Sequence, residues 1–378
     1  MANITAWLEN DPDQKKKYGR EITVAATESN FFNPMMGKGP WSIIRTSSDF
    51  DGSTATAQMG LRVELEGTGV KGNADFDENT DNQKYLYQPV EYDEFGNSLQ
   101  SQNKTLREKK HVDSFRESAQ EDLKMWAGHR SEKIITAKLT QNCSNIVACK
   151  AGATPVHAQN DTTAMTAGDV FTLGAARHAL KRSKQGFDGN NAIHPKLRPF
   201  VVKHKNIEGI PIKEEFRLMI LGPYAAEQLK DDPEWVSKQE SANNRGDSNP
   251  IFSGQMGHIT DGILFLEWNS WDATEAGILT SATAGFEDYA TGFDQYAGVG
   301  GIETELNLML GAGSSFLPMD TGFEYHEEGY DFNRKMKIAI SRGYAFEKAR
   351  YYGKTALEQK SKYHNKDYGT MLVASTKL

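Results

Sequence analysis

Carboxylates and tryptophans gather in one short stretch, Glu267–Trp268–Asn–Ser–Trp271–Asp272–Ala–Thr–Glu275, that could perform acid–base chemistry. Clefts that cleave sugars combine such residues, because one acid donates a proton while a second attacks or activates water. Glu267 and Asp272 would take these two roles. No histidine and no second acidic cluster clearly joins the stretch, and tryptophans at a strand end more often pack or contact another subunit. A soluble glycoside-type hydrolase is therefore kept only as an alternative.

Other motifs fall short of the chemistry that they resemble. Residues 75–81 look like the start of a calcium loop, but Thr80 replaces the turn glycine and Leu86 replaces the bidentate glutamate. The Gly-Lys pair at 37–38 lacks the upstream glycine and the following hydroxyl of a phosphate loop. His326 has no second histidine at zinc spacing. The sequence predicts no catalytic residue, no metal site and no cofactor.

Composition and charge indicate a globular chain that lacks the basic balance of a nucleic-acid-binding protein. The chain has 378 residues and a net charge of −8, whereas dedicated nucleic-acid-binding domains are usually basic. Single cores stop growing at about 250–300 residues, so two domains are expected. Only two cysteines occur, which predicts a reducing compartment and no disulfide framework. No run of apolar residues has the length of a membrane span and no secretory signal is visible, so synthesis and retention in a cytosol are expected.

The first 168 residues change their hydrophobic period more than once. Residues 1–40 are predicted to form an irregular arm that packs without regular structure. Residues 41–100 read as strands separated by turns rich in Asp, Gly, Ser and Asn. Residues 103–139 follow spacings of three and four, which predicts one long helix. Residues 140–168 are small and polar and read as a loop or insertion.

The remaining chain alternates predicted helices and strands. A helix is expected after Gly168, then strands in RPFVVKHK and EFRLMILG, and a helix in AAEQLKDDPEW. GILFLEWNSW is predicted to be a buried strand, ETELNLML a short helix, and RKMKIAIS a half-buried strand. The whole pattern predicts an α+β fold.

Both the strand pair and the long helix have an apolar face that something must cover. Leu61, Val63 and Leu65 alternate with charged residues, and glycines follow them. In the helix, one face carries Val112, Phe115, Ala119, Leu123 and Trp126. Extended, half-apolar arms without a convincing active site indicate a partner, and the simplest partner is another copy of the chain.

The order of these elements resembles the Hong Kong 97-like fold of tailed-phage major capsid proteins, and in detail the family of the phage N-four type. The motifs that carry the resemblance are LEGTGVKGNADFDENTDNQKYLYQPVEY, DSFRESAQEDLKMWAGHR, FRLMILGPYAAEQLKDDPEWVSKQ, NPIFSGQMGHITDGILFLE and GYDFNRKMKIAISRGYAFEKARY. They span roughly residues 40–350, and their ordered set is more telling than any one of them. Residues 140–168 and the chain after Lys354 show no family pattern.

The resemblance implies a division of the chain and a role for its arms. It implies an N-terminal arm at 1–40, an extended β-hairpin loop at 41–102, a peripheral domain with the long spine helix at 103–165 and 321–378, and a mixed α/β axial domain at 166–320. The extended loop would lie on the long helix of a neighbouring subunit. Its expected interface residues are Trp41, Leu61, Val63, Leu65, Gly67, Gly69, Gly72, Tyr85 and Tyr87. Those of the helix are Val112, Phe115, Ala119, Leu123 and Trp126.

The function that the resemblance implies is structural. Such a subunit would assemble with copies of itself into hexamers and pentamers of an icosahedral phage head that encloses double-stranded DNA. The expected partners are scaffold, portal and decoration proteins and DNA bound without sequence preference, with assembly in the host cytoplasm and no membrane. An acidic wall suits a DNA container because each neutralised phosphate would add affinity. Besides the hydrolase, the alternative is another virion protein that binds a lattice, such as a decoration or tail protein.

Overall fold

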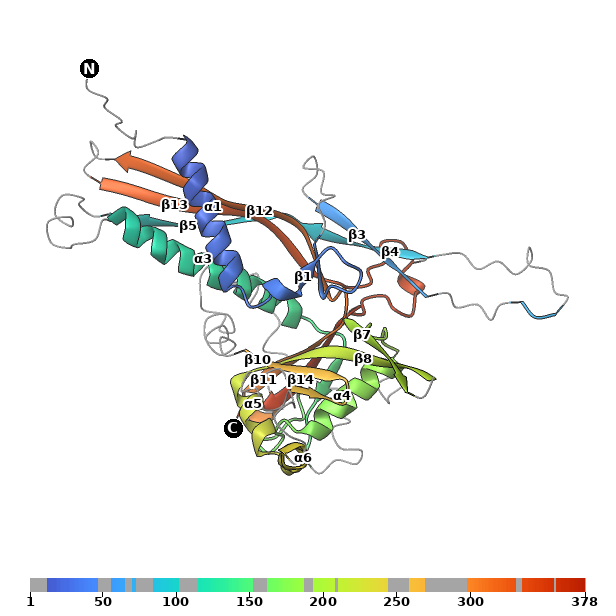
Figure 1. Ribbon diagram of the computed structural model, residues 1–378. Coiled ribbons are helices and arrows are strands. Elements are labelled where there is room, and N and C mark those ends of the chain that lie inside the picture. Colours follow the sequence, from blue (N-terminus) through green and yellow to red (C-terminus); the bar gives the residue numbers. More distant parts are fainter. Residues whose placement is uncertain are drawn as a thin grey trace, which may run out of the picture.

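The computed structural model is an α+β chain with two main sheets and a separate β-hairpin (Figure 1). The prediction of mixed helix and sheet is confirmed. The residues that the structure describes are 12–46, 56–64, 70–72, 84–101, 115–151, 162–186, 193–207, 210–243, 258–268, 298–330, 335–356 and 358–377.

The first sheet is built around two long antiparallel strands, β12 (Ser315–Tyr330) and β13 (Lys335–Lys348). The edge strand β5 (Asp93–Gln100) pairs antiparallel with β13. On the other side, β2 (Ile44–Thr46) pairs with the first residues of β12, and the two-residue β1 (Met36–Gly37) pairs with β2. The predicted strand in RKMKIAIS lies at the start of β13, whose residues alternate between buried and more exposed positions there.

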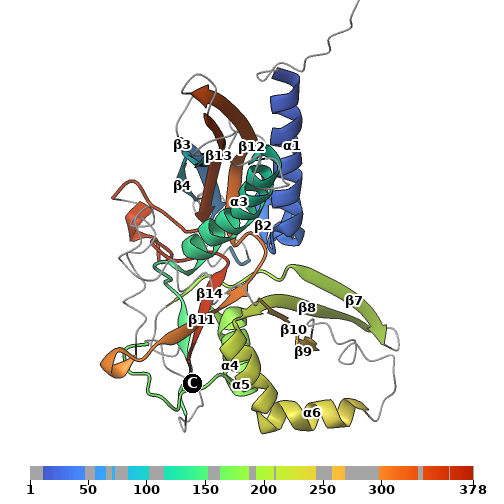
Figure 2. The ribbon, with the colours of Figure 1, turned by 90° about the vertical axis from the view of Figure 1, so that its left-hand side faces the viewer.

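Two helices cover one face of this sheet, α1 (Pro12–Ser29) and α3 (Phe115–Thr140). Figure 2 shows both beside β12 and β13. The predicted long helix is confirmed in α3, whose 26 residues extend over about 39 Å. Its first half packs on the first sheet, whereas Ile135 and Leu139 in its second half belong to the core of the second sheet. The helix therefore joins both parts of the molecule.

The prediction of an irregular arm at residues 1–40 is wrong for residues 12–29, because these form the regular helix α1. Pro12 stands at its first position, where the missing N–H costs nothing. The sequence misled because Gly19 and the β-branched Thr23 and Val24 are poor helix formers. Contacts with the sheet override this preference: Ile22 is buried, and a Cβ on Gly19 would lie 2.5 Å from the carbonyl oxygen of Phe323.

The second sheet has seven strands. Its order is β6 (Ile146–Ala148), β14 (Thr370–Thr376), β11 (Thr304–Leu310), β8 (Ile210–Leu221), β10 (Ile263–Glu267) and β9 (His258–Thr260), with β7 (Val201–Ile207) paired to β8. The predicted strands at β7, β8 and β10 are confirmed. The short helix expected in ETELNLML is wrong, because this segment is β11. All seven residues of β11 are buried, so the alternation that marks a strand is absent.

Helices α4 (Leu173–Gln185), α5 (Pro223–Asp231) and α6 (Pro233–Asn243) lie beside the second sheet (Figure 1). The single helix expected in AAEQLKDDPEW is thus two helices, divided at Asp232. The Asp232 carboxylate accepts from the backbone N–H of Leu173, 2.7 Å away, and of Glu234, 3.0 Å away, and so caps the starts of α4 and α6. The buried Glu305 caps α5 in the same way, by accepting from Ala225 N–H at 2.6 Å.

The pairing of β6 and β14 differs from the division drawn from the sequence. The resemblance groups residues 370–376 with the long helix, whereas β14 pairs antiparallel with β11 along its full length and parallel with β6. Residues 146–148 and 370–376 therefore lie in the same sheet as the strands of 166–320. No local feature of the sequence indicates this pairing, because the partners lie far apart along the chain.

Candidate assembly surfaces

The β-hairpin that the sequence predicts is formed by β3 (Thr56–Arg62) and β4 (Tyr85–Glu91), which pair antiparallel. Exposed and buried side chains alternate strictly along β4, so the hairpin has one buried and one exposed face. The buried face forms a small core with residues near the end of the chain. Its members are Leu61, Val63, Leu86, Phe316, Ala349, Tyr351, Tyr363 and Tyr368.

One buried glutamine fastens the hairpin to the body. Gln88 Nε2 donates to the carbonyl oxygen of Lys348 at 2.7 Å, and Gln88 Oε1 accepts from the backbone N–H of Arg350 at 2.7 Å. The side chain thus pairs with the backbone beyond β13 as another strand would. Tyr351 adds a bond from its hydroxyl to the carbonyl oxygen of Arg62 at 3.3 Å.

The interface role expected of Leu61 and Val63 stays a prediction, and within the single chain both side chains lie in this small core. Both are buried within their own chain, so their side chains need no neighbouring helix to cover them. The cover comes from tyrosines of the segment ARYY…KYHNKDYG. Tyr351 stacks on Tyr363 with ring centroids 5.4 Å apart. Closely spaced tyrosines were the one sequence signal of this role, and it was missed.

The exposed face of the hairpin carries the tyrosines of β4. Tyr85 and Tyr87 are 41% and 44% exposed, and their rings stack with centroids 6.4 Å apart. Tyr87 lies over Gly60 of β3, where an added Cβ would be 3.0 Å from the ring. Gly72 has a φ of +71°, which agrees with the conformational freedom expected of it. Leu65, Gly67 and Gly69 lie outside the described residues.

The long helix likewise buries its apolar face within the chain. Phe115, Ala119 and Leu123 pack against α1, β12 and β13, and Trp126 is half-buried with its ring 6.2 Å from that of Phe95. The interface role expected of these residues stays a prediction. Val112 lies outside the described residues.

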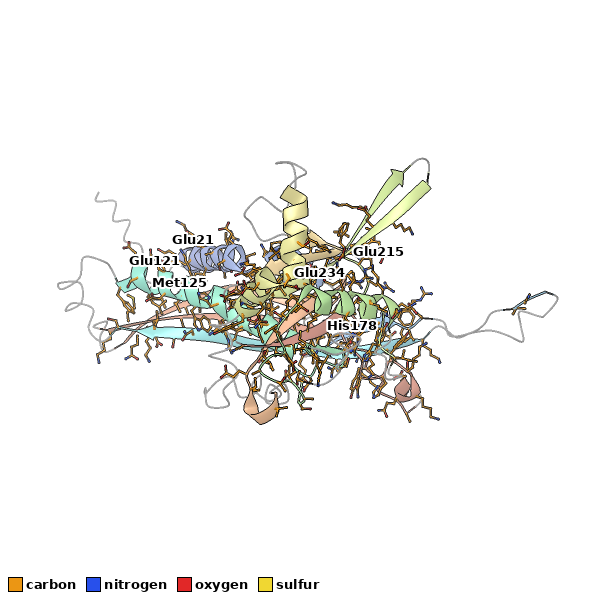
Figure 3. All side chains as sticks on the ribbon, turned by 90° about the horizontal axis from the view of Figure 1, so that it is seen from below. Glu21, Glu121, Met125, His178, Glu215 and Glu234 are labelled. Atoms are coloured by element: carbon orange, nitrogen blue, oxygen red, sulfur yellow. The ribbon has the colours of Figure 1, made fainter. Side chains whose placement is uncertain are left out.

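What α3 leaves exposed is a different set of side chains. Met125 is 65% exposed, and it lies about one turn from Glu121 of the same helix (Figure 3). Glu132, deeper in α3, is buried and accepts from the backbone N–H of Phe31 at 2.7 Å. Burial raises the pKa of the Glu132 carboxyl, and the bond from Phe31 opposes this rise in pKa.

Trp41 stands at the rim of an apolar hollow. Its side chain is 56% exposed, and the hollow of about 580 Å³ lies between the segment after α1 and the strands β8 and β10. Its other apolar lining residues are Phe31, Pro34, Met35, Met36, Ile43, Phe200, Leu218, Leu264 and Leu266. An exposed indole beside such a surface is typical of a contact site between proteins.

A buried charge cluster holds the end of α3 to the end of β13. The fully buried carboxylate of Asp367 lies 3.0 Å from Arg350 Nε and 3.4 Å from Lys348 Nζ. It also accepts from the backbone N–H of Ser144 at 2.6 Å. Lys348 Nζ donates to the carbonyl oxygen of Gln141 at 2.7 Å. The hairpin core and the long helix are thus joined through the same short segment.

The stretch proposed for sugar chemistry does not form a cleft in the part of the chain that can be described. Trp268 is buried and packs on Phe31 and Phe32, with centroids 5.4 Å apart in both cases. Glu267 lies 3.4 Å from Lys230 Nζ. Residues 269–297, which include Asp272, lie outside the described residues. Within the described ranges, no group of three or more potential ligands could hold a metal ion, and no helix is long and apolar enough to cross a membrane.

The fold is shared with solved capsid structures of phages. Among solved structures, the capsid of Helicobacter pylori bacteriophage KHP30 is similar, with a TM-score of 0.71, 22% identity and coverage of 92% of this chain and 91% of that chain. The head of Helicobacter pylori bacteriophage KHP40 is similar with a TM-score of 0.72 and 21% identity, covering 92% of this chain and 91% of that chain. The capsid of cyanophage Pam1 has a TM-score of 0.66 and 18% identity, with coverage of 92% of each chain.

The sequence comparison gives the family. The family model described as phage capsid protein matches residues 7–377, so the chain belongs to the phage capsid protein family. It is also 24% identical over 383 residues to the major structural protein ORF14 of bacteriophage KHP30, covering 94% of this chain and 93% of the relative. The chain is a structural capsid subunit found in the virion, and the resemblance drawn from the sequence is confirmed at this level. The hydrolase alternative is not supported.

Proposed function

We propose that this chain is the major capsid subunit of an icosahedral head, assembled as hexamers and pentamers around double-stranded DNA in a Hong Kong 97-like arrangement. The observation that carries the proposal is the hairpin, which projects from the body and presents Tyr85 and Tyr87 on its uncovered face. Exposed, rigid aromatic residues are enriched where proteins bind each other. The hairpin's exposed face, rather than its buried one, would contact the neighbouring subunit.

Further surfaces would complete the lattice. Trp41 with its apolar hollow, and Met125 on α3, would contact neighbouring copies. The hairpin would serve as the extended loop, the first sheet with α3 as the peripheral domain, and the second sheet as the axial domain. We extend the axial domain to include β6 and β14, since these strands pair in its sheet. Gly72 and the glycines before it would let the loop change its angle between non-equivalent positions.

The remaining partners follow from the same role. Scaffold, portal and decoration proteins would bind the assembled shell, and assembly would take place in the host cytoplasm. The net charge of −8 supports a container that contacts its DNA only weakly and without sequence preference. A decoration or tail role is less well supported, because the match to the capsid family spans nearly the whole chain.

The proposal is tested with Tyr85→Ser combined with Tyr87→Ser. Because both rings are largely exposed, the free energy of unfolding should fall by no more than about 1 kcal/mol. Particle formation, measured by sedimentation and negative-stain electron microscopy after coexpression with the phage's other head proteins, should fall at least tenfold. Tyr352→Ser is the control, since this tyrosine is 41% exposed but lies outside the hairpin. Normal yields of closed particles from the double variant would refute the proposed contact.

A further inference from the structure

The strand β5 forms one border of the first sheet, and within the described ranges no strand pairs with its outer edge (Figure 1). It pairs with β13 in continuous register from Asp93 to Gln100, without the shifts that interrupt the pairing of β12 with β13. Edge strands are usually protected by lysine, proline or a bulge, and β5, which reads DEFGNSLQ, has none of these. Its edge is therefore suited to pairing with another chain.

The ladder with β13 shows which backbone groups lie on this outer edge. Ser101 N–H donates to the carbonyl oxygen of Met336 at 2.9 Å, so Ser101 points its backbone groups toward β13. Successive residues of an antiparallel strand point these groups to opposite sides. The even-numbered residues of 94–100 therefore point their N–H and C=O groups outward.

Two of these outward N–H groups are held by side chains of the same strand. Glu94 N–H donates to Asp93 Oδ1, and Ser98 N–H donates to Asn97 Oδ1, each at 2.8 Å. These bonds agree with the outward direction assigned from the ladder. They also cover part of the edge in the single chain, and both side chains can rotate away when another acceptor arrives.

Apolar surface remains partly open along the same edge. Phe95 and Leu99 are half-buried at the margin of the core beneath α1 and α3. Trp126 of α3, also half-buried, lies beside Phe95 with ring centroids 6.2 Å apart. A strand added to β5 would cover these side chains as well as pair with the backbone.

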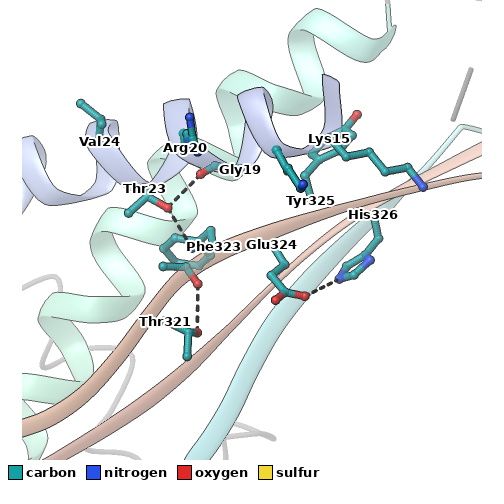
Figure 4. A pocket seen from close by; sticks show the side chains of 12 residues that line it. Lys15, Gly19, Arg20, Thr23, Val24, Thr321, Phe323, Glu324, Tyr325 and His326 are labelled. Carbon is teal, nitrogen blue, oxygen red and sulfur yellow. Dashed lines mark hydrogen bonds and ion pairs between the residues drawn. The ribbon is translucent and has the colours of Figure 1, made fainter. Parts of the chain in front are cut away.

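The helix layer over this sheet is fixed by direct contacts. Thr23 Oγ1 of α1 accepts from the backbone N–H of Phe323 of β12 at 2.8 Å (Figure 4). Tyr18 packs on Tyr325 with ring centroids 5.4 Å apart. A partner strand would therefore add to a surface that already has its final form, which lowers the entropy lost on binding.

We propose that β5 pairs antiparallel with β5 of a second copy around a two-fold axis at Asn97, so that the first sheets of two subunits become one continuous sheet. Residues 94, 96, 98 and 100 of one copy then face residues 100, 98, 96 and 94 of the other and exchange about eight main-chain hydrogen bonds. This pairing rests on the proposed function, a shell built of identical copies, and is separate from the contact made by the hairpin.

The side chains favour this register over its neighbours. Phe95 lies opposite Leu99 of the second copy, in the non-hydrogen-bonded pairs where side chains are closest. Glu94 lies opposite Gln100, so no like charges oppose each other. A shift of two residues, the smallest that keeps the hydrogen-bond pattern, would place Asn97 opposite Phe95 or Leu99. Such self-complementarity is what a two-fold contact requires, and it favours a second copy over an unrelated peptide.

Cysteine trapping at the axis tests the pairing. Asn97→Cys places the thiols of two copies in a non-hydrogen-bonded pair, whose Cα separation of about 4.5 Å a disulfide can bridge. In the control Gln100→Cys the two thiols would lie about 20 Å apart along the strand. The native Cys143 and Cys149 are both buried and do not compete. In closed particles oxidised with copper phenanthroline, Asn97→Cys should form disulfide-linked dimers at least about tenfold faster than Gln100→Cys, measured by intact mass.

A second control identifies the register. Ser98 reaches the axis only if the strands shift by two residues, so Ser98→Cys should form dimers more slowly than Asn97→Cys. Faster trapping in Ser98→Cys than in Asn97→Cys would overturn the proposed register. Equal rates in Asn97→Cys and Gln100→Cys would overturn the pairing.

A second readout leaves Asn97 unchanged. Gln100→Lys places an amine opposite Glu94 of the second copy, where a carbodiimide should join the two by an amide bond. Within one strand these positions lie about 20 Å apart, so a cross-link between them joins two chains. Peptide mapping should find this cross-link in particles of Gln100→Lys, and its absence would overturn the pairing.

Electron microscopy of the parent tests the proposed function separately. If the parent forms no closed particles after coexpression with the other head proteins, the proposed shell is wrong. The same trapping and cross-linking on the concentrated, isolated chain then decide the pairing. Dimers at position 97 above the control rate would support it there, and rates equal to the control would overturn it.

Discussion

Gln88 offers the sharpest test of how the hairpin is held, since it makes two bonds to the backbone of residues 348–350. In Gln88→Ala, the Lys348 carbonyl and the Arg350 N–H lose their partners beneath the hairpin. A buried backbone group left without a partner costs about 1–3 kcal/mol, so two of them cost about 2–6 kcal/mol. Water entering at the hairpin edge relieves part of this cost, and we expect a loss of about 3 kcal/mol in the free energy of unfolding.

The control is Gln58→Ala, which removes the same side chain from an exposed position of the partner strand β3. Its effect should stay within about 0.5 kcal/mol. Urea unfolding followed by tryptophan fluorescence gives both values, and trypsin cleavage after Arg62 and Lys84 reports on local detachment. If Gln88→Ala and Gln58→Ala lose the same stability and are cleaved at the same rate, the anchoring role assigned to Gln88 is wrong.

The other predictions concern the long helix. Leu123→Ala should lower the free energy of unfolding by about 2–4 kcal/mol in urea, because Leu123 is buried between α1 and the first sheet. Met125, two residues away, is exposed, so Met125→Ala should change the free energy of unfolding by less than about 0.5 kcal/mol. Equal effects of the two substitutions would contradict the packing. Burial raises the pKa of Glu132 in the folded state, so the folded chain holds this proton more tightly than the unfolded chain, and stability should fall as the pH rises from about 4.3 through the raised pKa. Glu132→Gln has no carboxyl to titrate, so its free energy of unfolding relative to that of the parent should be higher at pH 7 than at pH 4, measured by urea unfolding at both pH values. If the difference between variant and parent is the same at both pH values, Glu132 does not have a raised pKa.

Elements with a clear local period could be predicted from the sequence. The start of β13 alternates between the two faces of a sheet, and α3 repeats its apolar residues every three or four positions. β11 could not be predicted in this way, because it is central in its sheet and buried on both faces. It therefore has no polar face that would reveal a period of two. Its Leu, Met and Glu residues also favour helix when judged alone.

Long-range contacts could not be predicted, and they decide what the interface residues do. Gln88 and Lys348 are 260 positions apart, and nothing near either residue indicates the other. The alternation around Leu61 correctly predicts an apolar face, but not whether its own chain or a neighbour covers it. The same holds for α1, where Gly19 weakens the helix signal although the contact with β12 requires a glycine there.

The internal covering of these faces has a physical consequence for assembly. A shell subunit that left Leu61, Val63 and the apolar face of α3 open would expose surface able to associate in any register before a lattice exists. Covering them with tyrosines and α1 leaves half-exposed aromatic side chains, such as Tyr87 and Trp41, as the proposed contacts. Such residues bind through smaller areas and defined geometry, so each contact is weak and reversible, and stability comes from repetition around the shell. Correct assembly needs this reversibility, because a misplaced subunit must be able to leave.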